Sequence, residues 1–367
     1  MKFTCQASEI KEKIQSLAKV SQKTGLDPIF ECVYIQNEDH NLTLRSANTE
    51  IIAEQNIPIK GEINGSCLVN ASLLSKVLSN IAKSSDVITF EKIDNTLRIQ
   101  NNKNHTDIDL YNESMFPKIQ NGGEKIFSIS KDLFIEVVRS VAFCAATTEI
   151  KPEIASVYLY TKDGKLYSAA TDSYRLAEKS VFFEGENQLN ILIPQKNISQ
   201  ILSILDQEKE NDLDIVKNDD HIIFETKNSF ISTRLTEGSF PDYKQLFPKE
   251  FEFSFSVRKE VLQNALELSS IINNQTPICS MEYNAENQTI LINSEEKGVG
   301  QMTKEIPVKS EHKEDIKVFY NSNYFLEGLS KINSENISLK YTTTNRPLFI
   351  QNEEDISFIY LLMPVNR

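Results

Sequence analysis

The hydrophobic positions of the chain switch between two spacings, and the switching predicts the secondary structure. Around Leu74, Val77 and Leu78, apolar residues recur every three or four positions, as on the buried face of a helix. Elsewhere apolar and polar residues alternate around turn signals such as Asp163-Gly164, which is typical of strands joined in hairpins. Helical spacing occurs in six segments: 8–24, 71–84, 131–145, 195–205, 258–272 and 322–332.

The same pattern occurs three times along the chain. "CVYIQNEDHNLTLRSAN" at Cys32, "SVYLYTKDGKLYSAATD" at Ser156 and "SMEYNAENQTILINSEE" at Ser280 start 124 residues apart. The offset of 124 also relates two later strand–helix segments, "CLVNASLLSKVLSNI" from Cys67 and "ILIPQKNISQILSIL" from Ile191. A third copy of this segment follows 127 residues after the second. Few residues are identical, so hydrophobic pattern is repeated rather than sequence.

The repeat predicts three similar domains, 1–121, 122–249 and 250–367. The segments that join them are polar and carry turn residues. Each domain is expected to hold two helices packed on antiparallel sheet, which is an α+β class.

Charge is distributed unevenly over these elements. The chain has 367 residues, with 39 Lys and Arg against 52 Asp and Glu, a net charge of −13. This balance argues against a protein that grips nucleic acid through bulk positive charge. However, the six helical segments hold twelve basic and seven acidic residues, +5, which leaves −18 elsewhere. Either helix surfaces here simply favour lysine, or a modest positive surface faces a polyanion and contacts phosphates without reading sequence.

The cysteines and the N-terminus bear on the protein's compartment. Five scattered cysteines without a C-x-x-C pair are expected to be reduced core thiols, as in cytosolic proteins. The N-terminal segment is charged where a signal peptide would be apolar, and no run of 18 apolar residues occurs. We therefore expect a cytoplasmic protein without a membrane span.

One short stretch, "AATDSYRLAEKS" at 169–180, brings Thr171, Asp172, Tyr174 and Arg175 together like an active site. No phosphate-binding loop, nucleophile elbow or metal-ligand spacing accompanies it, and the four histidines are isolated. We therefore expect no enzyme, no metal and no cofactor. A hydrolase or transferase that uses Asp172 and Arg175 stays an alternative.

Two further segments are apolar and are expected to be accessible at the surface: "EGSFPDYKQLFP" at 237–248 and the C-terminal "ISFIYLLMPVNR". They either pack at the edge of a core or line a concave surface suited to peptide recognition. A peptide-binding scaffold without a DNA role is therefore a second alternative.

Three motifs, "AATDSYRLA", "EGSFPDYKQLFP" and "YLLMPVNR", together resemble those of the bacterial DNA sliding clamp, the beta subunit of DNA polymerase III. The resemblance spans the chain and implies the DNA clamp fold, in which two chains form a head-to-tail homodimeric ring. Helices line its hole, through which duplex DNA passes without sequence preference. Such a clamp is a non-catalytic processivity factor. It tethers the DNA polymerase III alpha subunit, the clamp loader, other polymerases and repair proteins through their short linear motifs.

The resemblance also implies three sets of site residues. In the peptide cleft, Thr171 and Arg175 would fix the peptide or the cleft itself, Ser173 replaces the usual glycine, and Gln245 stands where a basic residue is common. The dimer seam would include Ile271 and Ile272. The implied DNA-facing cations are Lys19, Lys23, Lys151 and Lys196. The complete implied cleft comprises Ile154, Thr171, Ser173, Tyr174, Arg175, Leu176, Pro241, Gln245, Leu246, Pro347, Met363, Pro364 and Val365.

Overall fold

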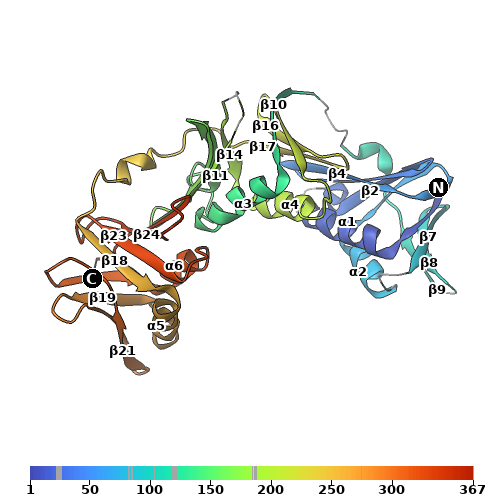
Figure 1. Ribbon diagram of the computed structural model, residues 1–367. Helices are drawn as coiled ribbons and strands as arrows, with labels where there is room; N and C mark the ends of the chain where they lie inside the picture. Colours follow the sequence, from blue (N-terminus) through green and yellow to red (C-terminus); the bar gives the residue numbers. More distant parts are fainter. Residues whose placement is uncertain are drawn as a thin grey trace. The chain divides into compact units, whose positions relative to one another are not determined.

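The computed structural model describes residues 1–21, 27–81, 83, 86–102, 104–117, 122–183, 185, 188–273 and 275–366. Within these residues it has six α-helices, one at each predicted segment, which confirms the helix prediction. They are α1 (Ala7–Val20), α2 (Ala71–Ile81), α3 (Lys131–Val141), α4 (Gln195–Leu205), α5 (Lys259–Ile272) and α6 (Ser322–Leu329) (Figure 1). None of these helices is long and apolar enough to cross a membrane.

The chain forms two compact units. Unit 1 comprises Met1–Glu136 and Glu184–Thr236, and unit 2 comprises Val137–Phe183 and Glu237–Arg367. Each unit therefore joins one of the predicted outer domains to a part of the middle one.

Unit 1 contains two antiparallel sheets with helices between them. Helix α1 contacts β1 of one sheet and β2, β3 and β4 of the other, and it buries Ile10, Ile14 and Leu17 completely. Helix α2 lies beside α1, and α4 packs on β14 (Asn190–Pro194) and β17. The first sheet has the order β5 (Lys60–Ile63), β1 (Lys2–Gln6), β7 (Val87–Ile93), β8 (Thr96–Asn101), β9 (Asn104–Asp109). The second has the order β10 (Glu124–Ser130), β15 (Asp212–Asn218), β16 (His221–Glu225), β17 (Ser229–Arg234), β4 (Ile51–Pro58), β3 (Asn41–Ala47), β2 (Cys32–Glu38), β6 (Gly65–Asn70).

Unit 2 repeats this arrangement. Helices α5 and α6 contact each other, and each packs on strands of both sheets of the unit. One sheet runs β11 (Ser156–Lys162), β12 (Lys165–Thr171), β13 (Arg175–Phe182), β25 (Phe358–Leu362), β24 (Leu348–Asn352), β23 (Asn336–Tyr341), β18 (Phe253–Arg258). The other runs β21 (Gly300–Pro307), β20 (Thr289–Glu296), β19 (Ile278–Asn284), β22 (Ile316–Asn321). Short 3-10 helices follow in both units, among them η2 (Glu113–Met115), η3 (Ala142–Cys144) and η4 (Tyr243–Leu246).

The strand pairing confirms the sequence repeat at the level of single residues. The hairpin predicted at Asp163-Gly164 joins β11 to β12, and both residues have positive φ, 49° and 70°, as a tight two-residue turn requires. In unit 1, Arg45 lies opposite Tyr34 and Glu54. In unit 2, Ala169 lies opposite Tyr158 and Glu178, each exactly one repeat later. The two sheets therefore present equivalent rows of side chains.

Candidate functional site

The turn between β12 and β13 is held by hydrogen bonds from its own side chains. The Asp172 carboxylate accepts the backbone N–H groups of Tyr174 at 2.9 Å and Arg175 at 3.0 Å. The Thr171 hydroxyl accepts the Ser173 N–H at 3.1 Å and donates to the Arg175 carbonyl at 2.6 Å. Ser173 has φ 78°, a left-handed conformation that glycine adopts at lower cost. Serine therefore occupies a position where the backbone favours glycine.

The Arg175 guanidinium joins this turn to the rest of unit 2. Its Nε donates to Asp172 at 2.9 Å and Nη1 donates to Glu327 of α6 at 2.6 Å. Its Nη2 donates to the Phe143 carbonyl at 3.2 Å, and its Cζ lies 4.2 Å from the centre of the Tyr324 ring. Burial alone would lower the pKa of Arg175, but the hydrogen bonds to Glu327 and Asp172, with the nearby acidic groups of Tyr360 and Cys144, raise it. Arg175 is thus a fixed cation whose three guanidinium nitrogens each donate a hydrogen bond within the protein.

The C-terminal segment is tied down beside this turn. Strand β25 pairs with β13 from Phe358 to Leu362. Beyond it, the Met363 N–H donates to the Tyr174 carbonyl at 2.9 Å, and the Val365 N–H donates to the Phe319 carbonyl at 2.8 Å. The apolar tail therefore both completes a sheet and reaches the surface next to the 171–176 turn.

The linker 237–248 is anchored by a buried polar network. Tyr243 is buried, and its hydroxyl donates to the carboxylate of Glu178, which is 4% exposed. The Tyr160 and Tyr243 hydroxyls are 2.9 Å apart, and the Lys244 Nζ lies 2.5 Å from Glu178 Oε2. Burial, followed by the nearby Glu178 charge, raises the pKa of Tyr243, so this hydroxyl keeps its proton. The Lys244 amino group also faces the rings of Tyr167, Tyr243 and Phe247 at 4.8–5.3 Å.

These three segments line one open cleft of about 260 Å³ in unit 2. Its floor is apolar, since Leu176, Tyr243 and Leu361 belong to one buried cluster with Ala169 and Phe349. The structure brings together eight residues of the predicted cleft: Ile154, Thr171, Ser173, Arg175, Leu176, Pro241, Leu246 and Met363.

The other predicted cleft residues do not line this cavity. Tyr174 is 65% exposed, and the Gln245 side chain donates to Asp242 at 2.8 Å. Pro347 is buried ahead of β24, and Pro364 and Val365 lie past the lining residue Met363.

Sequence reasoning missed three residues that line the cleft: Asp242, Tyr243 and Leu361. Leu361 could have been found, because alternate residues of a strand share a face and Met363 is two positions later. No sequence signal shows that Tyr243 turns inward, since it lies in an irregular linker.

The cations implied for DNA contact are partly engaged. Lys19 Nζ donates to Ser203 at 2.9 Å, and Lys196 Nζ lies 2.5 Å from a Glu50 carboxylate oxygen. Lys151 is exposed in the 150–154 turn, whereas Lys23 lies outside the described residues.

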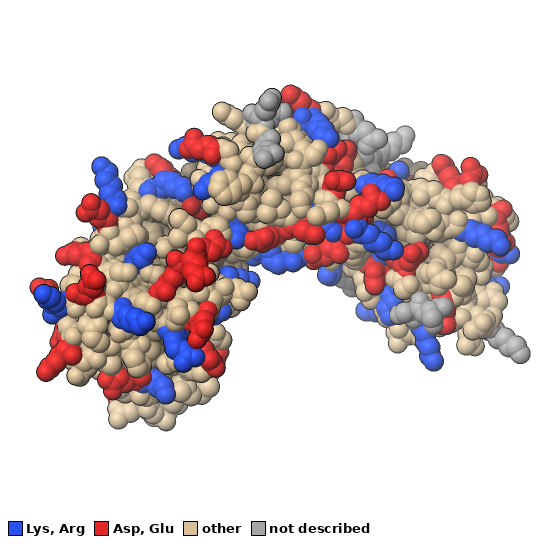
Figure 2. Space-filling model, in the orientation of Figure 1, with Lys and Arg blue, Asp and Glu red and all other residues tan. Residues whose placement is uncertain are grey.

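The positive charge counted over the predicted helical segments, +5, depends on where the helices end. Within the observed helix bounds there are eight basic and seven acidic residues, a net charge of +1. Of the other four cations of the +5 count, Lys83, Arg258 and Lys331 lie beyond the helix ends, and Lys23 is outside the described residues. On the face that Figure 2 shows, basic and acidic side chains are interspersed.

The end of α5 exposes one of the two isoleucines implied for the dimer seam, together with Leu268. Ile271 is 69% exposed and Leu268 is 48% exposed, whereas Ile272 is partly buried. One of the two adjacent isoleucines thus points outward from the chain.

The remaining reactive side chains are accounted for by packing. All five cysteines are free and buried, as expected of core thiols, and burial raises the pKa of each one. Among the described residues, no group of three or more His, Cys, Asp or Glu side chains could hold a metal ion.

Comparison with known proteins gives one family over the whole chain. The sequence matches the N-terminal domain of the DNA polymerase III beta subunit at 1–120, the central domain at 128–242 and the C-terminal domain at 244–366. It is 24% identical to the beta sliding clamp of Bacillus subtilis, over all of this chain and 99% of that protein.

Solved structures of the same kind share the fold. The DNA polymerase III beta subunit of Thermotoga maritima has a TM-score of 0.93 and 20% identity, covering 100% of this chain and 99% of that one. The sliding clamp of Bacillus subtilis has a TM-score of 0.90 and 22% identity, with the same coverage. The chain therefore belongs to the family of the bacterial DNA polymerase III beta subunit, the beta sliding clamp.

Proposed function

We propose that the protein is a DNA sliding clamp: a ring of two chains that surrounds duplex DNA and holds replication proteins beside it. Membership of the family over the whole chain supports this function. One observation supports the tethering role: the 171–176 turn, the linker 237–248 and Met363 line a single apolar cleft. Such a protein acts in the cytoplasm, as a processivity factor without a reaction of its own.

The charge of the helices fits retention by enclosure. Protein–DNA affinity grows with the number of phosphates that are neutralised. Helices with a net charge of +1, whose Lys19 and Lys196 already have partners, would bind duplex DNA only weakly. A ring needs no strong phosphate affinity to stay on DNA, and weak affinity favours sliding.

The cleft suits short peptide motifs with apolar side chains. Its floor is formed by Leu176, Tyr243 and Leu361, and most of its polar groups bind each other. The ligands we propose are linear motifs of the DNA polymerase III alpha subunit, the clamp loader, other polymerases and repair proteins. Thr171, Asp172 and Arg175 shape the turn at one wall, which favours a positioning role for them over a catalytic one.

The tethering role is tested with a fluorescent peptide that carries the clamp-binding motif of the polymerase alpha subunit. Met363→Glu places a charge in the apolar cleft and is expected to weaken binding by about tenfold or more. Ile356→Glu is the matched control, because Ile356 is 66% exposed and does not line the cleft. Equal binding by Met363→Glu and the unmodified protein would contradict the cleft assignment.

The ring is tested by mass and by DNA topology. Ile271→Asp is expected to give monomers in analytical ultracentrifugation, because a charge would be buried in the seam, whereas Ile150→Asp at an 88% exposed site remains dimeric. The loaded protein should stay on closed circular DNA and leave linear DNA by its ends. Equal retention on both DNA forms would exclude enclosure.

A further inference from the structure

Of the described residues, two with charged side chains line the cleft of unit 2: Arg175 and Asp242. The Arg175 guanidinium is paired with two carboxylates, at 2.9 Å to Asp172 and 2.6 Å to Glu327. Its side chain is 10% exposed, and its third nitrogen donates to the Phe143 carbonyl. The charge of Arg175 is therefore compensated within the protein and gives little attraction to an anionic ligand.

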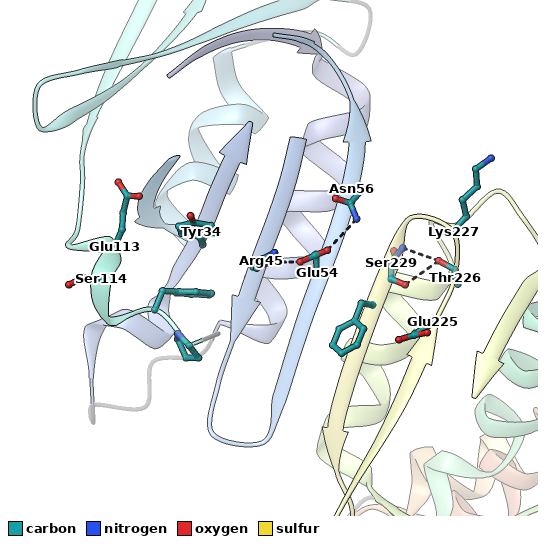
Figure 3. A pocket seen from close by; sticks show the side chains of 13 residues that line it. Tyr34, Arg45, Glu54, Asn56, Glu113, Ser114, Glu225, Thr226, Lys227 and Ser229 are labelled. Atoms are coloured by element: carbon teal, nitrogen blue, oxygen red, sulfur yellow. Dashed lines mark hydrogen bonds and ion pairs between the residues drawn. The ribbon is translucent and has the colours of Figure 1, made fainter. Parts of the chain in front are cut away.

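The Asp242 carboxylate has a neutral partner instead. In the part of the chain that the structure describes, it accepts one hydrogen bond, from the Gln245 amide at 2.8 Å, and it forms no ion pair. By contrast, the carboxylate of Glu54 in unit 1 is paired with the guanidinium of Arg45 (Figure 3). An amide donor carries no charge, so the negative charge of Asp242 is not compensated at the wall that the linker forms.

Asp242 also stands at a position where aspartate usually caps a turn. It immediately precedes η4, and an Asp or Asn before a helix normally accepts an N–H group of the first turn. Asp27 does so before η1 (Pro28–Glu31), with its Oδ1 3.0 Å from the Ile29 nitrogen, and Asn112 caps η2 in the same way. The Asp242 side chain makes no such bond and lines the cleft instead. This carboxylate is thus directed to the site rather than to its own turn.

The surrounding charges leave the cleft negative. The one cation of η4 is engaged, because the Lys244 amino group lies 2.5 Å from Glu178 Oε2. After β25 the C-terminal tail turns to the other sheet of the unit, where the Val365 N–H donates to the Phe319 carbonyl. The 150–154 turn adds one charge of each sign. The described groups that line or support the cleft then comprise four carboxylates and two cations, an excess of two negative charges: Asp172, Glu178, Asp242, Glu327, Arg175 and Lys244.

We propose, building on the peptide-binding function proposed for the cleft, that Asp242 makes it select motifs in which a lysine or arginine stands beside the apolar residues. The apolar side chains of the ligand would cover the floor of Leu176 and Leu361. The long stem of the neighbouring lysine or arginine would follow the apolar wall while its charge reaches Asp242. A glutamate at the same place would face the carboxylate and bind more weakly, so one residue both favours and disfavours ligands.

The effect falls on the choice among partners rather than on the total affinity. Asp242 is exposed, and an exposed ion pair is weak and is screened by salt. The apolar floor supplies most of the affinity, since it is shared by every ligand. A change of charge at position 242 should therefore alter the ratio of Kd values between ligands more than the binding of any one ligand.

The test uses the full-length protein and three fluorescein-labelled peptides, followed by anisotropy. Each carries the alpha-subunit motif, and they differ only in the residue placed on both sides of it: lysine, glutamine or glutamate. We expect the lysine peptide to bind about threefold more tightly than the glutamine peptide, and the glutamate peptide about threefold more weakly. Added salt should shrink both differences.

Three variants locate the source of this preference. Asp242→Asn removes the charge, and Gln245→Arg supplies an internal cation for it, since this side chain already reaches the carboxylate. Each should bring the ratio of the Kd values for the glutamine and lysine peptides from about three to about one. Glu286→Gln is the matched control, because it removes one negative charge from the exposed β19–β20 hairpin of unit 2 and should leave the ratio unchanged.

The glutamine peptide separates this proposal from the function on which it rests. If that peptide binds and Met363→Glu weakens its binding, the cleft function stands. Equal Kd values for the three peptides, an unchanged ratio in Asp242→Asn, or the same loss of the ratio in Glu286→Gln would then overturn the role of Asp242 alone. If the glutamine peptide does not bind, or binds regardless of Met363→Glu, the cleft function and the role of Asp242 are both overturned.

Discussion

Glu54 and Glu178 occupy the same place in two equivalent sheets but bind partners from different directions. Glu54 pairs across the strands with Arg45 of β3. The residue opposite Glu178 is Ala169, and Glu178 instead receives the Tyr243 hydroxyl and the Lys244 amino group from the linker. A small residue at 169 thus lets the linker close over the sheet, which builds the wall of the cleft.

The first prediction concerns this anchor. Glu178→Gln keeps the shape but removes the charge that Lys244 and Tyr243 bind, so it should lower the free energy of unfolding by about 1–3 kcal/mol. Guanidinium denaturation measures this change, and binding of the alpha-subunit peptide should weaken with it. Glu54→Gln is the matched control and should cost less than about 1 kcal/mol, because its pair lies nearer the surface. Equal losses in both variants would contradict the anchoring role of Glu178.

The second prediction concerns Ser173. Its φ of 78° is costly for an L-residue, so Ser173→Gly should raise the free energy of unfolding by about 0.5–1 kcal/mol. The N–H that binds Thr171 is retained, and the turn should keep its form. Ser180→Gly within β13 should have the opposite sign, because glycine weakens a strand. A thermal or chemical denaturation series decides the sign, and destabilisation by Ser173→Gly would show that the hydroxyl has an essential contact.

The third prediction concerns helix α6. A Cβ at Gly328 would lie 2.2 Å from two atoms of the Tyr360 ring. Although alanine favours a helix, Gly328→Ala should destabilise the protein by about 1–3 kcal/mol through overpacking. Exposed Asn323→Ala on the same helix should change stability by less than about 0.5 kcal/mol. If Tyr360→Leu does not relieve part of the loss in the double variant, the clash with Tyr360 is not its cause.

The fourth prediction concerns the buried thiols. Burial raises the pKa of Cys5, Cys32, Cys67 and Cys279 to about 12, while an unfolded thiol has a pKa of about 8.5. A folded pKa above the unfolded one stabilises the fold at low pH, and this contribution is lost as pH rises through the window between the two values. A thiol-reactive chromophore should therefore label the native protein very slowly at pH 7 and pH 9 alike. Labelling of any of these cysteines at the unfolded rate would contradict its burial.

The sequence predicted what depends on local periodicity. The six helices and the hairpin at Asp163-Gly164 follow from spacings of 3.6 and 2 residues, and an offset of 124 relates the quoted repeats. Helix ends were less predictable: Lys83, Arg258 and Lys331 belong to the predicted helical segments but lie outside the observed helices. The inward turn of Tyr243 could not be predicted, because it depends on the buried Glu178 that meets it across the sequence.

The pairing of β13 with β25 has a consequence for dissecting this protein. The two strands are far apart in the chain, and each supplies the hydrogen-bonding edge of the other. A fragment that stops at residue 249 would leave β13 with an open edge, which is a template for aggregation. The segments that unfold cooperatively should likewise be the two units rather than the three sequence repeats. Hydrogen exchange should then show two groups of amides within the middle repeat, one that opens with each unit.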